Sequence, residues 1–101
     1  MKSLHHLSLL FAVVALPAFA ADADNGKHLA QAYCSACHAV IASNWHGDVA
    51  DSPPFEVIAK KYDFDSELIA AHVINPHPRM NATLERSEAL DIAAYIISLA
   101  K

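Results

Sequence analysis

The sequence predicts an all-α protein, and three observations lead to this prediction. Apolar residues recur at helical spacing in residues 55–62 and 85–99. Residues that can begin or end a helix flank the four stretches expected to be helical, which are 22–33, 55–62, 68–74 and 85–99. No stretch shows the apolar–polar alternation of a half-buried strand, and no internal repeat is present.

Residues 1–20 have the features of a secretory signal peptide. Lys2 precedes an apolar run over 7–16, Pro17 breaks the run, and Ala18-Phe19-Ala20 fits the small-x-small rule for cleavage. An uncleaved anchor is less favoured, because a membrane span needs roughly 18 apolar residues. We therefore expect cleavage after Ala20, export to the periplasm, and one domain over residues 21–101.

Charge and size restrict what this domain can do. The formal net charge of the full sequence is −4, and the acids are spread along the chain. Nucleic acid, which requires a basic face, is therefore not an expected partner, and no stable membrane insertion is expected after cleavage. A domain of about 80 residues has a marginal core and usually needs a disulfide, a metal or a large cofactor.

The first expected helix, 22–33, contains an unfavourable residue. Asp22 or Asp24 can cap its start, where acids also suit the helix dipole. Gly26 costs about 1 kcal/mol relative to Ala inside a helix. Its presence therefore predicts a close contact at this position. Residues 39–52 follow without a sustained period and are expected to form a loop.

The other three helices have their own signals. Pro53 and Pro54 suit the entry of the second helix, because Pro is tolerated in a first turn. The third, 68–74, is expected to end at Asn75, since Pro76 pushes the residue before it out of the helical region. The last helix, 85–99, has an inward stripe with Tyr95 at its border: Ala89, Ile92, Ala93, Ile96, Leu99 and Ala100.

The strongest motif is Cys-Ser-Ala-Cys-His over residues 34–38. Two thiols at this spacing can bond both vinyl groups of one haem, and the adjacent His38 can then ligate its iron. A thioredoxin-like pair would require a βαβ pattern, and a zinc site would require further ligands. A plain disulfide between Cys34 and Cys37 would leave His38 without a role.

A second axial ligand is available in Met80. It is the only methionine that remains once Met1 is removed with the signal peptide, and it lies in a Pro-rich segment outside the helical stripes. A thioether ligand raises the reduction potential and suits an electron carrier. Histidine is the rival ligand, and four histidines other than His38 remain after cleavage: His28, His46, His72 and His77.

In the order of these motifs the chain resembles the class I cytochromes c of the short bacterial kind. Residues 26–38 are similar to the N-terminal helix and haem attachment of that family, and residues 53–59 to the segment after its first loop. Residues 77–80 (His-Pro-Arg-Met) resemble its distal ligand loop, and 84–98 its C-terminal helix. The resemblance implies a small cytochrome c fold of about four helices around one covalently bound haem c per chain.

The resemblance also implies individual roles. His38 would be the proximal and Met80 the distal iron ligand, and the Pro53 carbonyl would accept a hydrogen bond from the outer nitrogen of His38. Gly26 would be small because Tyr95 packs across it where the terminal helices cross. The pocket wall would comprise Phe55, Tyr62, Leu68, Ile92 and Ile96, and Trp45 or Arg79 would contact a haem propionate.

The function implied is one-electron transfer and not enzymatic catalysis. The protein would be a monomer that docks transiently on redox partner proteins in the periplasm. Three alternatives stay open from the residues. They are a peroxidase-like or sensor haem with open or bis-His iron, a fixed electron-transfer subunit of a larger dehydrogenase or oxidase complex, and a haem-free binding domain.

Overall fold

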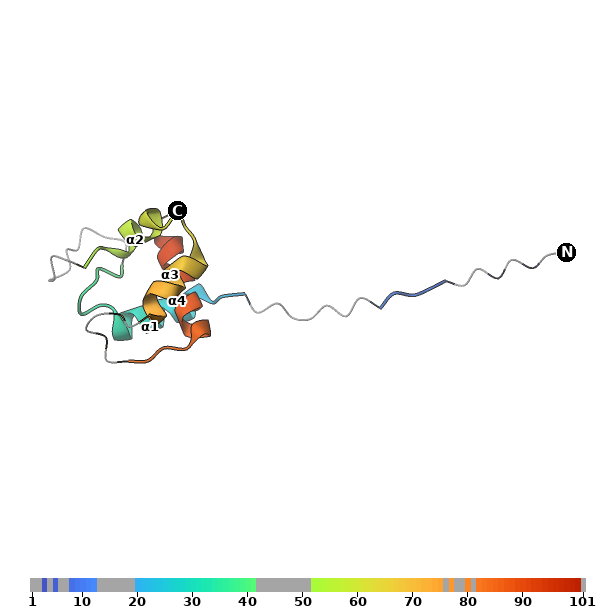
Figure 1. Ribbon diagram of the computed structural model, residues 1–101, viewed down its shortest axis with the longest axis horizontal. Helices are drawn as coiled ribbons and strands as arrows, with labels where there is room; N and C mark the ends of the chain where they lie inside the picture. The colour runs from blue at the N-terminus through green and yellow to red at the C-terminus, as the bar shows by residue number, and fades with distance from the viewer. Residues whose placement is uncertain are drawn as a thin grey trace.

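The computed structural model describes residues 3, 5, 8–12, 20–41, 52–75, 77, 80 and 82–100. Over these residues it contains the helices α1 (Ala23–Tyr33), α2 (Phe55–Lys61), α3 (Ser66–Ile74) and α4 (Arg86–Leu99), and no strand (Figure 1). The prediction of an all-α fold is confirmed. None of the helices in this part of the chain combines the length and the apolarity needed to cross a membrane.

Acidic caps determine where α1 and α3 begin. The Asp22 carboxylate accepts hydrogen bonds from the N–H groups of Asp24 and Asn25, at 3.0 and 3.1 Å. The Asp65 carboxylate accepts one from the N–H of Leu68 at 3.1 Å. Each bond satisfies a backbone donor that has no partner within the helix. The cap at Asp65 explains why α3 begins two residues earlier than its apolar pattern predicts.

Helix α4 is the centre of the fold. It packs against each of the other three helices, and most extensively against α1. A reciprocal capping box between Glu85 and Glu88 starts it. The core that it organises also contains Phe55 and Ala59 of α2 and Ile69 of α3. The buried residues of α4 include most of the predicted stripe: Ala89, Ile92, Ala93, Tyr95 and Ile96.

The close contact predicted at Gly26 is present, and it involves the backbone of α4. A Cβ atom at Gly26 would lie 1.9 Å from the carbonyl oxygen of Asp91 and 2.9 Å from the backbone nitrogen of Ile92. The backbones of α1 and α4 therefore approach so closely that only glycine fits. The nearest atoms belong to residues one turn before Tyr95, and the packing of the Tyr95 ring across Gly26 stays a prediction.

The side chain of Asp91 holds the same crossing together. Its carboxylate accepts a hydrogen bond from the Asp22 N–H at 2.7 Å and another from the Asn25 amide at 2.9 Å. An anion at the N-terminus of α1 also interacts favourably with the helix dipole. Helix α4 is thus attached to the start of α1 through both its backbone and its side chain.

Tyr95 connects α4 to the chain that follows the Cys-x-x-Cys-His motif. Its hydroxyl donates a hydrogen bond to the buried carbonyl of Val40. Its ring meets Phe55 edge-on, with 6.2 Å between the ring centres. Burial raises the pKa of the Tyr95 phenol. Tyr95 therefore joins α4 to the segments that precede and begin α2.

We predict that Gly26→Ala destabilises the protein by about 1–3 kcal/mol or more, because the added methyl group forces the two backbones apart. This loss exceeds the gain of about 1 kcal/mol in helix propensity. Chemical denaturation would measure the free energy of unfolding. The matched control is Ala32→Gly at an exposed position of α1, which should cost only the propensity term. A Gly26→Ala protein as stable as the wild type would contradict the contact.

We predict that Tyr95→Phe lowers the free energy of unfolding by about 1–3 kcal/mol at neutral pH, since the buried Val40 carbonyl loses its donor. The raised pKa of Tyr95 means that this residue stabilises the fold fully below about pH 10, its ordinary value, and less as the pH rises through the folded-state pKa. The stability difference between the two proteins should therefore shrink in alkali. Tyr33→Phe, at a residue that is 47% exposed, should leave the free energy of unfolding at neutral pH unchanged.

Candidate functional site

The two cysteines lie in a turn that directly continues α1. Cys34 ends the helix, with its N–H bonded to the Ala30 carbonyl at 2.8 Å. The N–H groups of Cys37 and His38 both donate to the Cys34 carbonyl, at 3.2 and 2.9 Å. Both thiols are free. The turn brings the two thiols and the imidazole to the same cavity.

His38 is oriented by the segment that leads into α2. Its Nδ1 atom lies 2.7 Å from the carbonyl oxygen of Pro53, so the contact expected between these residues is present. The ring of Phe55 lies beside it, with 5.7 Å between ring centres. The N–H of Phe55 donates to the Ala39 carbonyl at 3.1 Å, which attaches this segment to the residue after His38.

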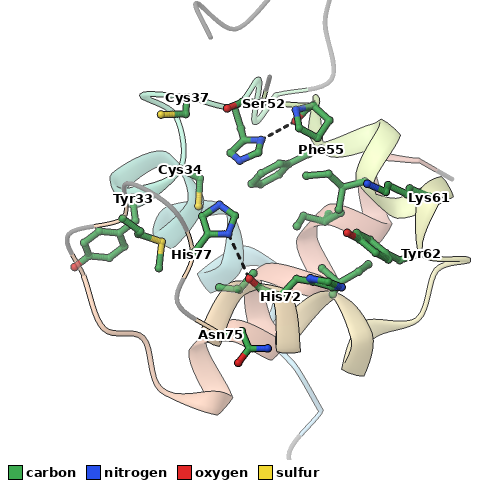
Figure 2. Close-up of a pocket in the computed structure, with 17 residues that line it drawn as sticks. Tyr33, Cys34, Cys37, Ser52, Phe55, Lys61, Tyr62, His72, Asn75 and His77 are labelled. Atoms are coloured by element: carbon green, nitrogen blue, oxygen red, sulfur yellow. Dashed lines mark hydrogen bonds between the residues drawn. The ribbon is translucent and has the colours of Figure 1, made fainter. Parts of the chain in front are cut away.

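The segment after α3 contributes from the other direction. His77 and Met80 both face the same cavity, and the Met80 N–H donates to the His77 carbonyl at 3.3 Å. Nδ1 of His77 lies 3.3 Å from the carbonyl oxygen of His72 in α3. Figure 2 marks this contact with a dashed line. On α3 itself, the His72 ring stacks on Tyr62, with 4.6 Å between ring centres.

These groups enclose a cavity of about 560 Å³. The side chains in its wall that could ligate a metal are two thiols, a thioether and three imidazoles. Among the described residues of the wall, Lys61 carries a formal charge. The volume falls in the range of sites for organic cofactors, about 300–1,000 Å³. The residues that line it are Tyr33, Cys34, Cys37, His38, Ser52, Pro53, Phe55, Ile58, Lys61, Tyr62, Ile69, His72, Val73, Asn75, His77, Met80 and Ile96 (Figure 2).

Burial of Cys34 favours the neutral thiol over the thiolate. Burial raises its pKa to about 11, from an ordinary value of 9.0. Because the thiolate is the form that oxidises and attacks electrophiles, a raised pKa lowers the fraction of Cys34 that can react at neutral pH. The folded site therefore holds Cys34 in place but does not activate it.

The structure brings some of the residues predicted for the haem pocket to this cavity and not others. Phe55, Tyr62 and Ile96 line the cavity. Leu68 does not, and its side chain is 43% exposed, because α3 turns the next residue, Ile69, inward. Ile92 is fully buried but lies at the crossing of α1 and α4 and does not reach the cavity. Trp45 and Arg79 lie outside the described residues.

Several lining residues had no role in the sequence analysis. Ile69 and Val73 are members of the apolar run of α3, but a run that is apolar on every side does not reveal which residues face the cavity. Lys61 carried no signal beyond its charge. Its ammonium group lies over the Tyr62 ring, 5.4 Å from the ring centre. These placements depend on how α2 and α3 turn toward each other.

The chain is 47% identical over 83 residues to Cytochrome c-552 of Bradyrhizobium diazoefficiens, and this alignment covers 81% of the chain and 79% of the relative. The chain belongs to the class I c-type cytochromes. It is accordingly an electron-transfer protein and not an enzyme, and its cofactor is a covalently attached haem c. No family model and no solved structure matches the sequence.

The cavity of this cytochrome has the chemistry that a haem c requires. Two thiols are available for thioether bonds, and an imidazole and a thioether are available as iron ligands. Apolar side chains suited to the faces of the macrocycle come from α2, α3 and α4: Phe55, Ile58, Ile69, Val73 and Ile96. The residues present therefore fit the cofactor of the family.

We predict that Phe55→Ala costs about 3–5 kcal/mol of stability, because it removes a ring that is 3% exposed between His38 and Tyr95. The matched control is Phe64→Ala, which removes a ring that is 44% exposed and should change stability by about 0.5 kcal/mol or less. Thermal unfolding followed by circular dichroism compares the two. If both variants lost the same stability, the packing of Phe55 between His38 and Tyr95 would contribute no more than an exposed ring.

Proposed function

We propose that this cytochrome is a monomeric, periplasmic one-electron carrier whose haem is bonded to Cys34 and Cys37 and ligated by His38 and Met80. One observation carries the proposal: the Cys-x-x-Cys-His turn and Met80 line the same cavity, although Met80 follows His38 by 42 positions in the sequence. When bound, the haem iron accepts and releases a single electron. The chain's own residues attach, orient and enclose it.

His38 is suited to the proximal position by the contact of its Nδ1 atom. A carbonyl oxygen only accepts hydrogen bonds, so the neutral ring places its proton on Nδ1, facing Pro53, and its lone pair on Nε2. This bond fixes the tautomer and orientation of the ring, and it increases the electron donation of Nε2. Phe55 supports the same orientation by lying beside the ring.

Met80 supplies the second ligand in this proposal. Its side chain is partly buried against the core and faces the cavity. A thioether stabilises the reduced state of the iron more than a second imidazole does, and so gives a higher reduction potential. An iron with both axial positions filled is also closed to peroxide, which suits an electron carrier better than a peroxidase.

Lys61 is the residue that we propose as a partner for a haem propionate. It lines the cavity, and its ammonium group is an appropriate counter-ion for a carboxylate. Trp45 and Arg79, which the resemblance implied for this role, are in parts of the chain that are not described. Lys61 therefore joins them as a third candidate.

Export is the part of the proposal that concerns the N-terminal residues. Leu9, Leu10 and Phe11 are 70%, 93% and 81% exposed, so these three residues of the apolar run have no packing role against the helices. A run of this kind fits a segment that is removed by signal peptidase. The protein would then meet its redox partners through small, transient and salt-sensitive contacts.

The first test is an absorption spectrum of the protein matured in a bacterial periplasm, in oxidised and reduced forms. We expect one covalent haem per chain, identified by mass, and in the oxidised form the long-wavelength band that marks iron–thioether ligation. Covalent haem without this band would contradict Met80 as the ligand. Absence of covalent haem would contradict the whole proposal.

We also predict that the double variant Cys34→Ala, Cys37→Ala yields little folded protein, because a domain of about 80 residues depends on the cofactor to complete its core. Yield and helical circular dichroism in the periplasmic fraction would measure this. Ser35→Ala, which changes a residue between the two cysteines, should keep both haem and fold. A cooperative, fully helical double variant would show that the core is sufficient alone.

A further inference from the structure

The cavity contains a second imidazole that the proposed pair of ligands does not use. The ring of His77 lies across the cavity from that of His38, with 5.9 Å between ring centres and 35° between ring planes. His77 belongs to the short segment that also carries Met80. The side chain of His77 therefore reaches the same cavity as both proposed ligands.

In each ring, the contact of Nδ1 with a carbonyl oxygen leaves Nε2 as the nitrogen that can bind a metal. Nδ1 of His38 lies 2.7 Å from the Pro53 carbonyl oxygen. Nδ1 of His77 lies 3.3 Å from the His72 carbonyl oxygen. Each carbonyl accepts the proton of a neutral ring, so the lone pair is on Nε2 in both. Among the described residues, neither Nε2 atom takes part in a hydrogen bond.

The separation of the rings agrees with a shared metal. Two imidazoles bound to opposite sides of one metal ion, each with a metal–nitrogen distance of about 2 Å, have ring centres about 6 Å apart. The observed 5.9 Å is close to this value. His77 is thus within reach of the iron that His38 ligates in the proposed function.

We infer that His77 is a reserve ligand, whose Nε2 atom binds the iron when the bond between iron and Met80 is lost. This inference rests on the proposed attachment of haem and on Met80 as the resting ligand. A second imidazole lowers the reduction potential relative to a thioether. It also keeps the sixth position filled, so that loss of Met80 does not leave an iron that is open to peroxide.

The test uses holo-protein with covalent haem at neutral pH, and compares wild type, Met80→Leu, and Met80→Leu with His77→Ala. Leucine conserves the volume of methionine but cannot ligate. We expect the wild type to show the thioether band. Met80→Leu should lose the band, remain low-spin by electron paramagnetic resonance, and have a lower midpoint potential. The double variant should lose the low-spin signal, become high-spin, and bind cyanide faster than Met80→Leu.

Two matched controls separate His77 from other histidines. Met80→Leu combined with His72→Ala removes the neighbouring cavity imidazole, and Met80→Leu combined with His28→Ala removes an exposed one on α1. Both should stay low-spin. Helical circular dichroism would verify that each variant is folded.

Three results would overturn the reserve ligand. The first is a high-spin Met80→Leu protein. The second is a low-spin signal that survives when His77→Ala is added to Met80→Leu. The third is a wild type that lacks the thioether band and whose iron becomes open when His77→Ala is made alone. The first two leave the proposed function intact, provided that mass spectrometry finds covalent haem. A wild type without covalent haem overturns both proposals.

Discussion

The close approach of α1 and α4 at Gly26 is the constraint on which the rest of the structure depends. No side chain separates the two backbones there, and the Asp91 carboxylate adds two hydrogen bonds to the start of α1. This contact determines the direction in which α1 runs and therefore where Cys34 emerges from its end. Farther along α4, Tyr95 bonds the Val40 carbonyl and so holds the chain just beyond His38.

The helices leave a cavity at the place where a larger protein would have a core. Gly26 and several alanines are buried in the helices, and four larger side chains of α2 and α3 line the cavity: Phe55, Ile58, Ile69 and Val73. A haem is an appropriate solution for a chain of this length, because one large, rigid, apolar group replaces many side chains. The same group then performs the redox chemistry of the family, so folding and function depend on a single cofactor.

The two sides of the cavity differ in the number of side chains that could ligate iron. His38 is held by the Pro53 carbonyl, by Phe55 and by the turn that contains both cysteines. His77 and Met80 share one short segment and one cavity. A proximal ligand that does not move and a distal segment with an imidazole and a thioether would allow the potential of the iron to change without rearrangement of the helices.

The sequence by itself determined the features that depend on neighbouring residues: the four helices, the acidic caps, the turn at 34–38 and the need for a close contact at Gly26. Only the tertiary structure decided which residues meet. It placed the backbone of Asp91 against Gly26, turned Ile69 and not Leu68 into the cavity, and brought His77 opposite His38. The physical reason is that helical periodicity indicates an apolar side of a helix, whereas the rotation of each helix and the path of each loop depend on packing between segments distant in the chain.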